Sequence, residues 1–313
     1  MAAAECSEER RGAHATNVGA YVSLALMVLL GSGTAPAAKF AVSELPVGLL
    51  PLARFGGASL CLLPIVWRSG VLGRMIRHDF RQLALASVFC VPINQYFLLN
   101  GARLAPTSHV ALIYASCPLV VTVLTALLGQ ERFIANRLAG IIMSVLGVLV
   151  IGLENLFHSG ATGRNTLWGD LYLVGAVASW GAYLTFNKPL ITRHGAIPAL
   201  AGTFLLGSFL DVPIALASLP TWPPLLEVSP AAWRGLAYLT VGASVVGFAF
   251  QNLALRRFDA SQVATVNNAS PILTVLWGIW LFGEALTPAL AVGGALTLGG
   301  ILWTSRPNSR SSD

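Results

Sequence analysis

The chain has 313 residues, of which 55% are hydrophobic and only 10% are charged, and its mean hydropathy is +0.72. An ordinary soluble domain has about 25% charged residues, and a water-soluble core of this size cannot hide so much apolar surface. Lipid must therefore be the solvent for much of the chain. The net charge of +6 lies in short loops between apolar runs, which indicates membrane topology and excludes a nucleic-acid-binding face.

The cysteine pattern excludes other classes of protein. The four cysteines are Cys6, Cys61, Cys90 and Cys117, and the last three lie inside apolar runs. None of the four belongs to a CxxC or Cys/His spacing. We therefore expect buried, inert thiols and neither a disulfide framework nor a zinc site. No metal or cofactor is expected.

Ten apolar runs follow one another, each long enough to cross a bilayer core of about 30 Å as a helix. They predict spans near residues 18–39, 47–67, 82–101, 108–129, 137–153, 168–188, 197–218, 233–254, 261–282 and 288–304. Helix caps or a first-turn proline mark three starts, at Thr107 and Ser108, at Asn136, and at Thr287 and Pro288. The first run ends in small residues and could be a secretory signal. Because it matches a later run, we expect it to remain as the first span.

Lysine and arginine gather on one side of these spans. With the amino terminus in the cytoplasm, 14 of the 19 basic residues lie on the cytoplasmic side and 4 outside, and Arg54 lies inside the second span. Basic residues in short loops favour the cytoplasm, so the sequence predicts a multi-pass protein of the cell (inner or plasma) membrane with both termini cytoplasmic. Four arginines in the 68–81 loop predict attraction to anionic membrane lipid.

An internal repeat relates the two halves of the chain. Shifting the region around 108–129 by 153 positions places it on 261–282 without a gap. The matched pairs include Arg103 with Arg256, Ser108 with Ser261, Pro118 with Pro271, Glu131 with Glu284, Gly140 with Gly293 and Gly147 with Gly300. The earlier spans align at an offset of 149, which pairs Lys39 with Lys188, Phe55 with Phe204 and Pro64 with Pro213. Ordered matches of Pro, Glu and Gly are hard to obtain by chance.

The repeat predicts the organisation of the chain. It comprises a cytoplasmic tail (1–17), a first five-helix unit (18–153), an outer linker (154–167), a second five-helix unit (168–304) and a second cytoplasmic tail (305–313). Because five is odd, the two units insert with opposite orientation, as in many secondary transporters. The predicted fold is an all-α integral membrane protein with ten transmembrane helices in two inverted five-helix repeats.

Several motifs point to a known family. They are Arg54 in the LARFG string at 52–56, the mid-helix prolines Pro118 and Pro271, the turns GQE at 129–131 and FGE at 282–284, and WGD at 168–170. On these the chain resembles the drug/metabolite transporter superfamily, in its EamA-type ten-helix branch, from about 18 to 304. The resemblance implies two EamA-like repeats and gradient-driven transport through a central cavity, often the export of amino acids, metabolites or toxic compounds. The first span departs from the family, because GSGT at 31–34 lacks the aromatic residue often found there.

Two charged residues lie inside predicted spans, where an ionisable group costs roughly 2.5–3.5 kcal/mol and so faces a cavity or a partner. Arg54 and Asp211 are expected at similar depth, about 10 Å below the outer interface, and would form an ion pair if their spans face each other. The pair could bind an anion or couple protons. Alternatively, Arg54 packs among helix carbonyls and Asp211 is bonded locally.

Polar side chains recur along several predicted spans, which favours a substrate-lined cavity over simple hydrogen bonding between helices. With Arg54 and Asp211, the candidate cavity residues are Asn94, Gln95, Tyr96, Tyr114, Trp180, Tyr183, Asn187, Gln251, Asn252, Thr265, Asn267 and Asn268. Pro118 and Pro271 leave the carbonyls of Tyr114 and Asn267 without a helical partner. These prolines could serve a ligand site or only kink the helix.

Three further features have less specific interpretations. Glu131 and Glu284 occur at helix–loop junctions and are expected to cap or tie the turns. His109 begins the fourth span, where it could sense pH or simply be solvated. Glycines in the last span, at Gly293, Gly294, Gly299 and Gly300, could pack a partner helix closely.

The predicted function is gradient-driven transport of a small amphipathic metabolite by alternating access, most simply the export of an amino acid or related compound. A proton could be the coupling ion. The alternatives are import or exchange of a vitamin-, nucleoside- or sugar-type solute and, in another class, a channel or a non-transporting receptor. No enzyme is expected, because the sequence has no HExxH motif or phosphate-binding loop. The protein could be a monomer or a homodimer.

Overall fold

The computed structural model describes residues 22–68, 70–127, 135–157, 161–250 and 269–304. Within these ranges it consists of helices and turns, without strands. The first half contains α2 (Thr34–Val42), α3 (Leu49–Trp67), α4 (Val71–His78), α5 (Phe80–Val88), η1 (Phe89–Ile93), α6 (Asn94–Leu104), α7 (Thr107–Ala115), α8 (Cys117–Leu127) and α9 (Ala135–Phe157). The second half contains α10 (Ala161–His194), α11 (Ala196–Ala217), η2 (Leu219–Thr221), α12 (Pro230–Ala237), η3 (Tyr238–Gly247), α15 (Ala269–Phe282) and α16 (Pro288–Thr304).

Five of the described helices are long and apolar enough to cross a membrane. They are Val22–Val42, Leu49–Trp67, Phe80–Leu104, Ala196–Ala217 and Pro230–Phe250. Shorter apolar helices cover Thr107–Val121, Ala269–Phe282 and Pro288–Gly300. Exposed leucine, isoleucine and tryptophan side chains are spread over these helices, as expected where lipid is the solvent. The chain is therefore an all-helical, multi-pass membrane protein.

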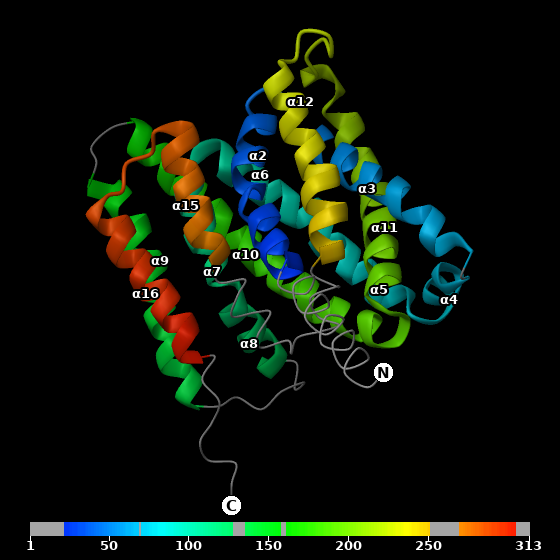
Figure 1. Ribbon diagram of the computed structural model, residues 1–313, viewed down its shortest axis with the longest axis horizontal. Coiled ribbons are helices and arrows are strands. Elements are labelled where there is room, and N and C mark those ends of the chain that lie inside the picture. The colour runs from blue at the N-terminus through cyan, green and yellow to red at the C-terminus, as the bar shows by residue number, and fades with distance from the viewer. Residues whose placement is uncertain (1–21, 69, 128–134, 158–160, 251–268, 305–313) are drawn as a thin grey trace, which may run out of the picture.

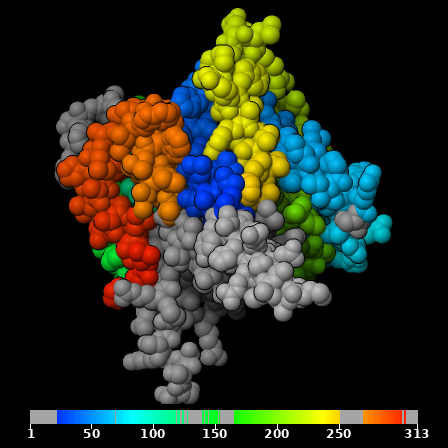
Figure 2. All heavy atoms as spheres, in the orientation of Figure 1, coloured from blue at the N-terminus to red at the C-terminus, as the bar shows by residue number. Residues whose placement is uncertain are grey.

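Helices of the two halves pack against each other throughout the bundle. The four most extensive contacts join α9 to α16, α10 to α6, α11 to α3 and α12 to α2, and α10 also packs on α5 and α8 as α15 does on α7. Figure 1 shows α9 and α16 side by side at one edge of the molecule. In Figure 2 the atoms of α2 lie between those of α15 and those of α12 and η3. Exchanging the helices that match in the sequence repeat (α2 with α10, α3 with α11, α6 with α12 and α9 with α16) leaves the four most extensive contacts unchanged.

Glycine allows the closest of these contacts. A Cβ on Gly147 of α9 would lie 2.5 Å from the carbonyl oxygen of Gly293, and one on Gly293 of α16 would lie 2.7 Å from that of Gly147. The two backbones therefore touch directly. Gly294 and Gly299 similarly face side chains of Leu112 and Met143, so these glycines of the last helix pack within the chain.

Two segments are wound as π-helices, which are rare and occur often at functional sites. Pro92 lies inside η1, where its missing N–H cannot donate to the carbonyl four residues earlier. The second segment, η3, extends over ten residues, Tyr238–Gly247. The repeat offsets of 149 and 153 carry residues 89–93 to 238–242 and 242–246, both within η3. Each half thus has a π-helical segment at the corresponding place in its third span.

The predicted helix starts and proline sites have mixed outcomes. The cap at Thr287 is confirmed, because its hydroxyl accepts the N–H of Leu290 at 3.2 Å. The caps at Thr107 and Ser108 are wrong, because α7 begins after Pro106 without a side-chain cap hydrogen bond of its own. The helix breaks at Ser116, between α7 and α8 and two residues before Pro118.

Candidate functional site

Arg54 lies in the first turns of α3, with only 7% of its surface exposed. Its Nε donates to Ser244 Oγ at 3.1 Å, and its Nη1 donates to Gln95 Oε1 at 3.3 Å. Ser244 belongs to η3 and Gln95 follows η1 by two residues. The guanidinium is therefore held between the two π-helical segments, one from each half of the chain.

Asn94 is the centre of a polar network beside Arg54. Its Nδ2 lies 3.0 Å from Tyr114 Oη, 2.8 Å from the carbonyl of Ala176 and 3.3 Å from Ser179 Oγ. Its Oδ1 accepts from Gln95 Nε2 at 2.8 Å. These contacts connect α6 and α7 of the first half with α10 of the second. We call Arg54, Asn94, Gln95, Tyr114, Ser179 and Ser244 the Arg54 cluster.

The polar face predicted on the sixth span extends this cluster. The rings of Trp180 and Tyr183 lie 4.7 Å apart, and Asn187 Nδ2 donates to Tyr183 Oη at 3.1 Å. Tyr183 and Asn187 are each 2% exposed. Cys90 and Tyr183 pack in one buried cluster with Phe55, the neighbour of Arg54, so the two groups lie in one region.

Asp211 is buried, but the expected ion pair with Arg54 does not form. Helix α11 does pack on α3, yet the guanidinium of Arg54 donates to Gln95 and Ser244. The carboxylate of Asp211 instead interacts with the backbone N–H of Leu52. Its Oδ2 has no hydrogen-bond partner in the part of the chain that the structure describes. Asp211 is thus a separate buried carboxylate on another side of α3.

Other predicted cavity residues lie elsewhere. Tyr96 is 51% exposed, and its ring lies against Phe97 and Tyr172. It points away because one residue rotates a helix by about 100°, and its neighbours Asn94 and Gln95 face inward. Pro271 lies near the start of α15, with its surface partly exposed. Six predicted residues lie outside the described ranges: Glu131, Gln251, Asn252, Thr265, Asn267 and Asn268.

Glu284 joins the two halves at one end of the bundle, which we call the Glu284 end. Its carboxylate accepts the N–H groups of Thr107 at 2.6 Å and Ser108 at 3.0 Å, and pairs with Lys39 Nζ at 3.0 Å. It therefore caps α7 from the other half, which is why Thr107 and Ser108 need no caps of their own. Burial raises the pKa of Glu284. The two N–H groups and Lys39 lower that pKa by a larger amount, so it lies below its usual value.

Two more contacts support the Glu284 end. The N–H of Ser229, the N-cap of α12, donates to Glu44 at 2.7 Å, and its hydroxyl also donates to that carboxylate. His109 was expected at the interface but is 6% exposed, and its Nδ1 lies 2.8 Å from Asp170 Oδ1. His109 is thus a buried partner of the WGD motif.

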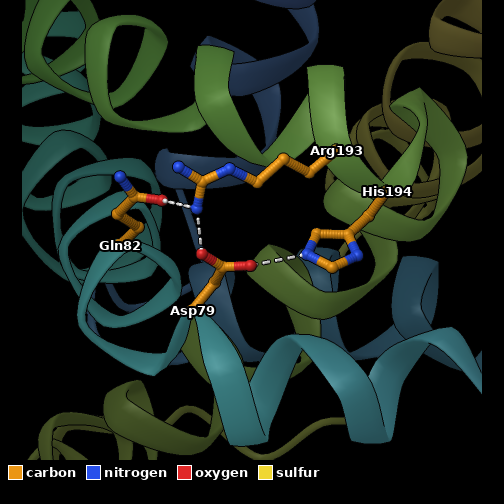
Figure 3. Close-up of polar contacts among 4 residues, drawn as sticks. All are labelled: Asp79, Gln82, Arg193 and His194. Atoms are coloured by element: carbon orange, nitrogen blue, oxygen red, sulfur yellow. Dashed lines mark hydrogen bonds and ion pairs between the residues drawn. The ribbon is translucent and has the colours of Figure 1, made fainter.

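A charged cluster lies at the carboxyl-terminal end of α10, and we call this end of the bundle the Asp79 end. Figure 3 shows the Asp79 carboxylate between Arg193 and His194, with one oxygen toward each. Arg193 also donates to Gln82 at 3.5 Å. The hydrogen bond from His194 and the charge of Arg193 hold the pKa of Asp79 below its usual value, although burial opposes this. Nothing in the sequence pattern singled out this cluster.

The described residues contain no group of three or more His, Cys, Asp or Glu side chains that could hold a metal ion. Cys61, Cys90 and Cys117 are free thiols, and only Cys61 is exposed. The chemistry available is therefore that of a polar, partly aromatic region between helices. Such a region suits reversible binding of a small solute.

Comparison with known proteins decides the family. The EamA-like transporter family matches the chain twice, over residues 18–153 and 167–306. The chain belongs to the EamA-like transporter family. It is therefore a membrane transporter, and the resemblance to drug/metabolite transporters is confirmed.

Individual relatives match over most of the EamA chain. A protein of Streptantibioticus cattleyicolor, named a probable terminal-alkyne amino-acid exporter, is 27% identical over 91% of this chain and 92% of its own. An aromatic amino acid exporter of Ancylobacter novellus is 26% identical over 66% of this chain and 69% of its own. One solved crystal structure aligns with 93% of this chain and 97% of its own at a TM-score of 0.59 and 20% identity, which shows a shared fold.

Proposed function

We propose that this transporter exports an amino acid or a related small metabolite across the plasma membrane, driven by a solute or ion gradient. The observation that carries the proposal is the Arg54 cluster. Its buried polar groups come from α3, α6 and α7 of one half and from α10 and η3 of the other. Polar groups at membrane depth are expensive and mark solute pathways. The names of the two exporters described above give the solute class.

This placement supports an alternating-access mechanism. A site built from both halves changes its exposure when the halves move relative to each other. The four most extensive helix contacts, which stay the same when matching helices of the two halves are exchanged, support two equivalent halves of this kind. Asn94 is the residue on which such motion would act most directly, because its amide bonds α7 and α10 at once.

The test is counterflow in proteoliposomes that contain the purified full chain, with L-phenylalanine and L-propargylglycine as probes. We expect saturable exchange and acceleration of labelled uptake by unlabelled amino acid inside. Asn94→Leu is expected to abolish exchange. Asn100→Leu is the matched control, because within the described part of the chain the Asn100 amide donates to the carbonyl of Tyr96 on its own helix. Flux that does not saturate would indicate a channel, and exchange of nucleosides or sugars alone would contradict the solute class.

A further inference from the structure

Arg54 is a buried cation whose hydrogen bonds go to neutral groups. Both acceptors, Gln95 Oε1 and Ser244 Oγ, are uncharged. The titratable neighbours Cys90 and Tyr114 are of types that are uncharged at neutral pH. No carboxylate forms an ion pair with Arg54 in the ranges that the structure describes. A buried charge without a counter-ion is costly, so this arrangement favours an anion supplied from outside the chain.

The way Arg54 is held distinguishes it from a packing residue. Ionisable residues inside a membrane commonly pair with one another or with backbone carbonyls, and they mark solute or ion pathways. Arg54 bonds side-chain oxygens instead, which can turn away when a better acceptor arrives. A guanidinium has five N–H donors, and the two hydrogen bonds described leave others for a ligand. Both acceptors lie in or beside π-helical segments, the kind of irregularity found at functional sites.

We propose that the guanidinium of Arg54 binds the carboxylate of the transported solute, and that Gln95 and Ser244 hold the guanidinium in place between the two halves. A carboxylate matches a guanidinium with two parallel hydrogen bonds. It also supplies the missing counter-ion. This inference rests on the proposed transport function, and it assigns the solute group that Arg54 recognises.

The experiment compares acids with matched neutral amides. The probes are L-phenylalanine against L-phenylalaninamide, and L-propargylglycine against its carboxamide. Thermal stabilisation of the purified full chain in detergent gives a half-saturating concentration for each probe. For the wild type we expect the acid to bind at least about tenfold more tightly than the amide, the smallest effect typical of a hydrogen bond to a charged group.

Two variants test Arg54 and its neighbour. Arg54→Gln is expected to bring the acid-to-amide ratio to about one, while Arg103→Gln, at an exposed position on α6, leaves it unchanged. Gln95→Glu places a permanent carboxylate beside Nη1, which lies 3.3 Å from the present Oε1. We expect this internal counter-ion to weaken acid binding at least about tenfold and to spare amide binding. Size-exclusion profiles and unliganded melting temperatures establish that each variant is folded.

Each outcome decides the inference. Folded Arg54→Gln that still prefers the acid overturns it, as does Gln95→Glu with unchanged acid binding, because Arg54 is then structural. A wild type that no acid stabilises, or that binds acid and amide equally, also overturns it, while transport of either probe would leave the proposed function standing. An acid preference that disappears in Arg54→Gln, without counterflow in proteoliposomes, supports the carboxylate site and refutes the transport proposal.

Discussion

Lys39 and Glu284 are 245 positions apart in the sequence and form an ion pair at 3.0 Å. The Lys39 ammonium also lies 4.6 Å from the ring centre of Phe282. Because Glu284 simultaneously receives two backbone N–H groups at the start of α7, it acts both as an ion-pair partner and as a helix cap. The two roles can be separated by substitution.

Glu284→Gln is expected to lower the free energy of unfolding by about 1–3 kcal/mol, because a charge-assisted cap and an ion pair are lost together. The double variant Lys39→Glu with Glu284→Lys restores opposite charges but supplies no acceptor for Thr107 and Ser108. We therefore expect it to remain destabilised in thermal melts. Full recovery by the double variant would mean that the ion pair dominates and that the cap is unimportant.

The stabilisation by Glu284 depends on pH in a defined direction. Its pKa is held below the usual value in the folded protein, so its contribution is present above the unfolded-state pKa and is lost as pH falls through the folded pKa. The melting temperatures of wild type and Glu284→Gln are therefore expected to differ at pH 7 and to converge in acid. A difference that grows in acid would contradict this assignment.

Asp79→Asn is expected to destabilise the Asp79 end at neutral pH, because Arg193 and His194 lose their shared carboxylate. The pKa of Asp79 is also held below its usual value, so the difference from wild type disappears as pH falls through that folded pKa. Thermal melts between pH 3 and 8 measure it. Gln82→Leu is the control, because its contact with Arg193 involves no charge on the glutamine.

Gly147→Ala is expected to destabilise the protein by about 1–3 kcal/mol, because the new methyl group meets the Gly293 carbonyl and the backbones must separate. Gly73→Ala is the opposite case. Gly73 lies on exposed α4 with no atom within 4 Å of an added Cβ, so alanine stabilises the helix by about 1 kcal/mol. Equal effects in thermal melts would contradict the direct contact between α9 and α16.

The predicted orientation can be tested with two single cysteines in a background without the four native ones. Leu226 is fully exposed between η2 and α12, and Gly73 is exposed on α4. We expect Leu226→Cys to react with an impermeant maleimide in intact cells, and Gly73→Cys to react only after permeabilisation. The reverse pattern would mean that the chain inserts the other way round.

The sequence predicted the apolar helices better than their contacts. The last span, predicted at 288–304, coincides with α16 and its Thr287 cap, because apolar length and local caps are properties of neighbouring residues. The partners of Arg54 could not be predicted, since Gln95 and Ser244 are 41 and 190 positions away. Pro92 was an available indication of η1, whereas η3 contains no proline.

The Glu284 end and the Asp79 end differ chemically although they correspond in position. The offset of 149 carries Glu44 to Arg193 and carries Asp79 to Val228, the neighbour of Ser229. The contact between Glu44 and Ser229, at the Glu284 end, joins a carboxylate to an uncharged serine. The contact between Asp79 and Arg193, at the Asp79 end, joins opposite charges, and the Arg193 side chain is 56% exposed. Dissolved salt screens exposed ion pairs, with a Debye length of about 3 Å at 1 M, and affects a bond to a neutral group far less. Ionic strength therefore loosens the Asp79 end more than the Glu284 end, where the ion pair of Lys39 and Glu284 is less exposed, at 28% and 10% of the two side chains.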